Sequence, residues 1–144
     1  MAAGLTAVSP AGGAVQHLRT RAQFQALLAH RPVARTAHFA LHRLPVPAPG
    51  TPEATLFGAP AQAWLGAMVP KRWARRAVTR NAIRRQIYRI ASDFEPQLAP
   101  AAHVVRLRAA FDRKVYVSAS SDALKGAVRD ELRALFERAN RGRP

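Results

Sequence analysis

The sequence predicts a single α+β domain, an α/β sandwich in which helices and strands follow one another along the chain. Two observations favour this class. The 144 residues are the length of one domain, which on folding buries roughly two-thirds of the surface of its unfolded chain. The hydrophobic pattern also changes its period along the chain, in the order helix, strands, helix, strand, helix.

The first element is expected to be a short helix over residues 18–28, "LRTRAQFQALL". This stretch contains no Gly or Pro, and Phe24 lies near the edge of its apolar side. Residues at helical spacing line that side: Leu18, Ala22, Gln25 and Leu28.

Three strands are expected, over residues 37–44, 61–70 and 103–108. In the first of them Phe39 and Leu41 point to one face, while His38, Ala40 and His42 point to the other. A proline-rich connection, "PVPAPGTPEAT", separates the first two strands because proline interrupts both helix and sheet.

Two longer helices complete the pattern, over residues 74–94 and 121–139. The apolar stripe of the first is Ile83, Ile87, Ile90 and Phe94, and that of the second is Leu124, Ala127, Val128, Leu132, Leu135 and Phe136. Polar or charged positions lie off the first stripe: Asn81, Arg84, Arg85, Tyr88 and Arg89. One side of this helix is therefore expected to be buried and the other to be covered with arginine.

The charge of the chain points to a polyanionic partner. The net charge is +15, and residues 71–90, "KRWARRAVTRNAIRRQIYRI", contain eight Lys or Arg residues and no Asp or Glu. Successive like charges at i, i+4, such as Arg76, Arg80 and Arg84, destabilise an isolated helix. Nucleic acid is the leading partner class, and an anionic membrane surface is the lesser one.

Several other functions are excluded or disfavoured. No apolar run reaches the ~20 residues that cross a bilayer, and we expect a cytoplasmic protein. Without cysteine there is no disulfide, thiolate nucleophile or Cys-based zinc site. His38 and His42 share a strand face without a further ligand, no phosphate-binding glycine loop is present, and the eight carboxylates form no pair beside His and Ser. We therefore expect no metal site and no catalytic residue in the protein, and any reaction that it serves to take place in a partner.

Four side chains allow two interpretations from the sequence alone. Phe24, Phe39 and His42 either belong to the core or stack on unpaired bases at an open sheet face. Asn81 is either a neutral surface residue or a donor to a phosphate or 2′-hydroxyl group.

The order of elements and the segment "KRWARRAVTRNAIRR" together resemble the protein subunit of bacterial ribonuclease P, over about residues 18–136. Arg80 and Asn81 fit the first two positions of that family's Arg-Asn-Arg motif, and Ile83, Arg84 and Arg85 fit the positions after it. Ala82 stands where the motif has its second Arg.

The resemblance implies a four-stranded sheet with a left-handed crossover and a single RNA-binding domain over residues 17–139. Residues 1–16 are then a flexible extension and residues 140–144 a flexible tail. In that family the RNA subunit, with Mg²⁺, hydrolyses precursor transfer RNA at the 5′ end of the mature sequence, and the protein binds both the RNA subunit and the 5′ leader. Neither DNA nor a membrane is an expected partner.

The resemblance also assigns residues to these two contacts. The residues expected to bind the RNA subunit are Lys71, Arg72, Arg75, Arg76, Arg80, Asn81, Arg84 and Arg85. The residues expected to bind the leader are Phe24, Phe39, His42 and Arg108. Two other functions stay open: a structural ribosomal or RNA-assembly protein without a catalytic partner, and a protein that cuts RNA by itself.

Overall fold

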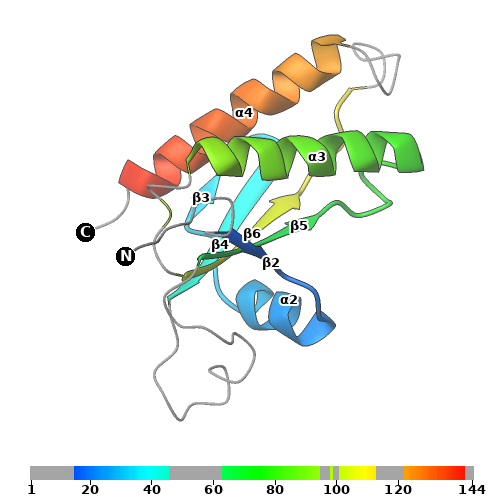
Figure 1. Cartoon of the computed structure of the whole chain (residues 1–144). Coiled ribbons are helices and arrows are strands. Elements are labelled where there is room, and N and C mark those ends of the chain that lie inside the picture. The colour runs from blue at the N-terminus through cyan, green and yellow to red at the C-terminus, as the bar shows by residue number, and fades with distance from the viewer. Residues whose placement is uncertain (1–14, 46–62, 95–97, 99–100, 113–121, 142–144) are drawn as a thin grey trace, which may run out of the picture.

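A computed structural model describes residues 15–45, 63–94, 98, 101–112 and 122–141, which form one mixed sheet between helices. Figure 1 shows α3 and α4 above the sheet and α2 below it. The elements, in chain order, are β2 (Val15–His17), α2 (Arg21–Leu28), β3 (Ala34–Arg35), β4 (Phe39–Pro45), β5 (Ala63–Met68), α3 (Ala77–Asp93), β6 (Ala101–Leu107) and α4 (Asp122–Arg141).

The sheet has the strand order β2-β5-β6-β4-β3. The strands β2, β5 and β6 run parallel, whereas β4 is antiparallel to β6 and to β3. This confirms the α+β class but gives five strands where four were expected, because β2 and the two-residue β3 extend the two edges. Helix α3 connects the parallel neighbours β5 and β6, and the left hand of that crossover stays a prediction.

The first helix begins at Arg21, three residues later than its pattern suggested. Leu18 continues the line of β2 instead, since its backbone N–H donates to the Leu65 carbonyl at 2.9 Å. The helix then starts with a capping box, in which Thr20 accepts from the Gln23 N–H and Gln23 accepts from the Thr20 N–H. The sequence "TRAQ" thus determines where the helix begins.

The core has two layers because the sheet is covered on both faces. Between the sheet and the pair α3 and α4 lie Phe39, Leu41, Val105, Leu107 and the buried stripes of the two helices. Between the sheet and α2 lie Leu18, Leu27, Leu44, Ala102 and Val104. The predicted alternation along β4 is confirmed, since Phe39 and Leu41 enter the first layer and Leu44 the second.

The predicted ends of the domain fall partly outside the described residues. Of the expected extension 1–16, Val15 and Gln16 lie in β2 and the remainder is outside the described part of the chain. Of the expected tail 140–144, Asn140 and Arg141 end α4 and residues 142–144 are outside it.

Candidate nucleic-acid interface

The first part of the candidate interface is the segment that leads from β5 into α3. The carbonyl of Pro70 accepts from the N–H groups of Trp73 and Ala74, which turns the chain toward the helix. Helix α3 then begins at its N-cap, Arg76, with no side-chain cap and no acidic residue in its first turn. Its positive end is therefore surrounded by further positive charge, an arrangement that favours a bound anion.

Arg80 fixes the shape of this segment. Its Nη1 donates to the carbonyls of Ala74 at 3.0 Å and Arg75 at 2.8 Å, one turn or more before it in the chain. The side chain is half-buried as a result. Arg80 is thus a structural arginine as well as a cation of the surface, a role that its motif position alone does not reveal.

The other predicted residues of the RNA-subunit contact share one property, which is access to solvent. Arg84 is half-buried and donates through Nη1 to the Asn81 Oδ1 at 3.1 Å, so that the Asn81 amide group keeps its NH₂ for another acceptor. The exposed members are Lys71, Arg72, Arg75, Arg76, Asn81 and Arg85. The fold brings all eight together on α3 and the residues just before it, and their contact with RNA stays a prediction.

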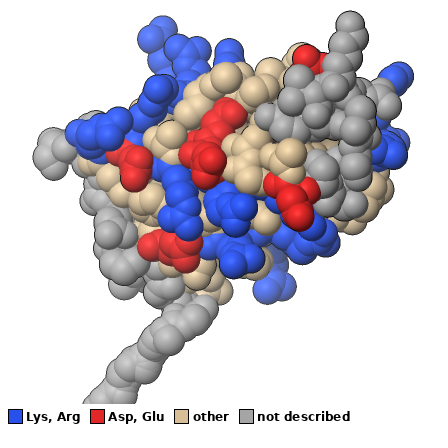
Figure 2. Space-filling model, turned by 90° about the horizontal axis from the view of Figure 1, so that it is seen from above, with Lys and Arg blue, Asp and Glu red and all other residues tan. Residues whose placement is uncertain are grey.

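The carboxylates of the described residues are confined to the later part of the chain, whereas Lys and Arg occur throughout it. All of these carboxylates come after Ser92: Asp93, Asp112, Asp122, Asp130, Glu131 and Glu137. Figure 2 shows Asp and Glu interspersed with Lys and Arg on the upper side of the molecule. Two ion pairs occur among the described residues, His38 with Glu131 at 2.8 Å and Arg133 with Asp93 at 3.1 Å. Neither of them neutralises a cation of the segment 71–76 or an arginine of α3.

The second part of the interface is a hollow of about 410 Å³ at the end of β5. Phe24 of α2, Met68 of β5 and Arg84 of α3 line it, together with Pro70. The position of the Phe24 ring depends on Gly66, because a Cβ there would meet Leu18 and Phe24 at 2.7 Å. Glycine thus lets the Phe24 ring lie directly against the strand with part of its surface exposed.

A cationic group lies on the α2 side of the sheet near the end of β6. Arg106 donates through Nε to His42 Nε2 at 3.4 Å, while His42 Nδ1 donates to the His30 carbonyl at 2.9 Å. These bonds require a neutral imidazole, and burial, with Arg106 and His30, lowers the pKa of His42 despite the opposing effect of that backbone bond. Burial and the neighbouring cations Arg108 and Arg72 lower the pKa of Arg106, which nonetheless stays charged.

Two of the four predicted leader residues need correction. Phe39 is fully buried in the layer under α3 and α4, so the leader prediction for it is wrong and its core interpretation is correct. His42 is 4% exposed, so it positions Arg106 and does not itself face a ligand. Arg108 is half-buried and donates to the carbonyls of Thr36 and Ala37, both at 3.0 Å. Phe24 alone of the four lines the hollow.

Sequence reasoning missed an aromatic pair between the edge strand β2 and helix α3. His17 stacks on Tyr88 with the ring centroids 4.2 Å apart, and both line a hollow of about 470 Å³ with Asn81, Arg84 and Arg85. Burial raises the pKa of Tyr88, although a hydrogen bond with the Ala67 backbone and the charge of Arg84 act in the opposite direction. The off-stripe position of Tyr88 was a signal for this site, whereas His17 gave none.

Arg106 was missed for a different reason. Strand alternation places it on the same face as Val104, which pairs with His42 in the sheet register. The signal was therefore present in the sequence, but only the pairing of β4 with β6 connects it to His42.

These features define a small α+β protein with an unneutralised basic helix beside an aromatic-lined hollow, the kind of surface that binds nucleic acid. The family model Ribonuclease P matches residues 14–140. The chain therefore belongs to the ribonuclease P protein family.

Individual relatives agree with this assignment. The ribonuclease P protein component of Burkholderia pseudomallei (strain 1106a) is 33% identical over 119 residues, which are 83% of this chain and 78% of that protein. The component from Ralstonia pickettii (strain 12J) is 35% identical over 119 residues, covering 83% and 75%. The structure of Staphylococcus aureus RNase P protein matches with a TM-score of 0.58 at 16% identity, covering 84% of this chain and 92% of that one. At that identity the likeness shows a shared fold.

Proposed function

We propose that this chain is the protein subunit of a ribonuclease P ribonucleoprotein, which removes the 5′ leader from precursor transfer RNA. The main support for this proposal is that the cations of residues 71–85 have no carboxylate partner in the described structure and adjoin the hollow lined by Phe24. Arg84 lines both hollows and thus joins the two parts of the interface.

The RNA subunit is assigned to the α3 side. Exposed guanidinium groups and the Asn81 amide suit phosphates and 2′-hydroxyls, which are the groups that structured RNA displays. The uncapped start of α3 adds backbone N–H donors to the same region. Arg80 contributes indirectly as well, because it holds residues 74 and 75 in place.

The 5′ leader is assigned to the hollow beside α2. A single-stranded leader offers unpaired bases, and the partly exposed Phe24 ring is a surface on which one base can stack. Arg106, held by His42, supplies a positive charge on the same face of the sheet, where it meets the phosphates of the strand. Phe39 is not part of this assignment.

We assign the hydrolysis to the RNA subunit and Mg²⁺. Among the residues that the structure describes, no three His, Asp or Glu side chains lie together as a metal site. The protein's part is then to offset phosphate repulsion between two RNA molecules and to position the leader. We place this work in the cytoplasm; within the described residues no helix is long and apolar enough to cross a membrane.

The test is site-specific cleavage of a leader-bearing precursor transfer RNA at low Mg²⁺ by protein alone, by a bacterial ribonuclease P RNA alone, and by both. We expect efficient cleavage only in the mixture. Cleavage by RNA-free protein would instead place the chemistry in this chain. No gain from the protein would favour a structural RNA-binding role.

A further inference from the structure

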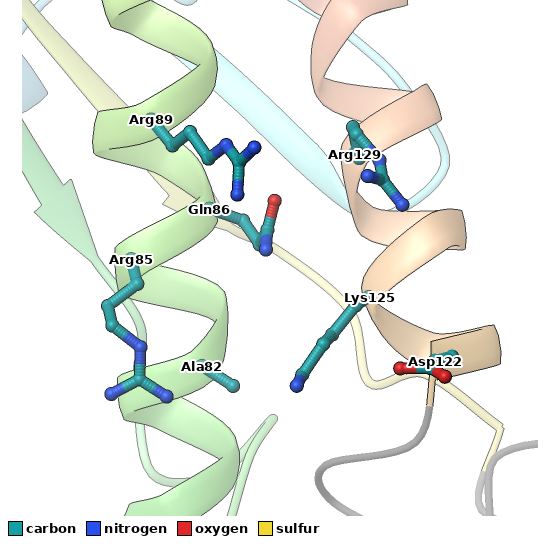
Figure 3. Close-up of a pocket in the computed structure, with 7 residues that line it drawn as sticks. All are labelled: Ala82, Arg85, Gln86, Arg89, Asp122, Lys125 and Arg129. Carbon is teal, nitrogen blue, oxygen red and sulfur yellow. The ribbon is translucent and has the colours of Figure 1, made fainter.

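A separate pocket lies between α3 and α4, on the side of α3 that faces away from the leader hollow. Its volume is about 300 Å³, and two cations from each helix line it, Arg85 and Arg89 from α3 and Lys125 and Arg129 from α4. Figure 3 shows Lys125 extending from α4 toward α3, with Gln86 and Arg89 extending from α3 toward α4. Side chains separated by about forty residues in sequence thus meet around one space.

The pocket lacks a counter-charge that matches its cations. One carboxylate, Asp122, lies at its end, and in the described structure none of the four cations forms an ion pair. Like charges gathered in a partly enclosed space repel one another, so the arrangement favours an anion between the two helices.

A small residue, Ala82, forms part of the pocket wall. Ala82 is 6% exposed and lines the pocket from the α3 side. The motif of the family has an arginine here, and an arginine at this position would extend into the space from α3. Its guanidinium would then occupy the volume that the alanine leaves open. In this chain the cations of α4 provide the positive charge at that place.

We propose that the α3–α4 pocket binds a phosphate group, supplied by the backbone of the RNA subunit. A phosphate oxygen accepts from guanidinium and ammonium donors, and the pocket volume accommodates it. The assignment of the phosphate to the RNA subunit rests on the proposed function, whereas the binding of an anion in the pocket does not. A free diphosphate offers the same chemistry, and the test separates the two sources.

The first arm measures the salt dependence of binding to a bacterial ribonuclease P RNA. The pocket variant is Lys125→Gln/Arg129→Gln. The matched control, Arg138→Gln/Arg141→Gln, removes the same number of charges that are unpaired in the described structure, from exposed positions of the same helix outside the pocket lining. For each phosphate that a variant no longer neutralises, the slope of log K against log salt decreases by about 0.7 to 0.9. We expect this decrease in the pocket variant and not in the control.

The second arm adds inorganic pyrophosphate to the protein without RNA and follows Tm. We expect a rise in Tm for the unchanged protein and the control, and its loss in the pocket variant. If this response depends on the pocket while the two RNA slopes are equal, the phosphate is a free one. If the pocket variant and the control agree in both arms, the proposal is overturned. Failure of the unchanged protein to bind the RNA would count against the proposed function. The pyrophosphate measurement would still show whether the pocket binds an anion.

Substitutions at residue 82 test the pocket by filling it. Ala82→Met occupies the space without adding charge, and we expect it to abolish the pyrophosphate response. Ala82→Arg places a further guanidinium in the same space, and we expect it to preserve the slope for RNA because that guanidinium meets the phosphate. A full pyrophosphate response in folded Ala82→Met protein would show that the anion binds elsewhere. If these variants do not fold, the Lys125 and Arg129 comparison still decides the proposal.

Discussion

At the scale of single residues, two glycines carry opposite expectations. A Cβ at Gly66 meets Leu18 and Phe24 at 2.7 Å, whereas one at Gly126 meets only the flexible end of Arg129 at 3.7 Å. Gly66→Ala should therefore destabilise the protein by about 1–3 kcal/mol through overpacking. Gly126→Ala, within α4, should stabilise it by roughly 0.5–1 kcal/mol. Urea denaturation measures both, and equal effects would contradict the close contact at Gly66.

His42 gives the protein a predicted sensitivity to acid. Because the pKa of His42 is lowered in the folded state, the unfolded chain takes up a proton more readily at this position. The corresponding stability is present above the ordinary pKa of about 6.5 and is lost as the pH falls through the lowered value. The free energy of unfolding should thus decrease from pH 7 toward about pH 5, and less steeply in His42→Asn. Parallel profiles would show that His42 has no such role.

At the scale of elements, α3 contains arginines of two kinds. Arg80 donates hydrogen bonds to two carbonyls, so Arg80→Ala should lower the free energy of unfolding by about 1 kcal/mol, a modest value because the side chain is partly exposed to solvent. The same substitution should also weaken RNA binding. Arg85→Ala should leave stability unchanged within about 0.5 kcal/mol and reduce the salt slope of RNA binding by about 0.7 to 0.9, the value for one phosphate. Urea denaturation and RNA titration of both variants separate the two roles. Equal stability losses would refute the distinction.

The prediction for the leader contact concerns Phe24 of helix α2. Phe24→Ala removes a stacking surface worth about 1–3 kcal/mol per base, so the preference for leader-bearing over leaderless precursor should fall by that amount. Affinity for the leaderless substrate should change little. Phe39→Ala is the matched contrast, because it empties a core position and should cost about 3–5 kcal/mol of stability. An unchanged preference in Phe24→Ala would remove Phe24 from the site.

The elements also show how far the sequence could predict the site. The isoleucine stripe of α3 predicted which arginines face solvent. The alternation along β4 predicted that Phe39 and His42 point to opposite faces of the sheet. Alternation does not tell which face is covered by two helices, so the burial of Phe39 could not be foreseen. Strand β2 could not be predicted either, because three residues are too few to show a hydrophobic periodicity. They form a strand only by pairing with β5. The hollow at Phe24 depends on a tertiary contact with Gly66, which local pattern does not reveal.

At the scale of the whole molecule, the net charge of +15 should lower the Mg²⁺ requirement of cleavage. Two RNAs brought together repel through their phosphates, and dissolved cations otherwise reduce this repulsion. The Mg²⁺ concentration at half-maximal cleavage should therefore be lower with the protein than without it. The difference should shrink as monovalent salt rises, since the Debye length falls from about 10 Å at 0.1 M to about 3 Å at 1 M. Equal Mg²⁺ requirements at low salt would contradict this role, and a salt-independent difference would attribute the benefit to leader positioning instead of charge.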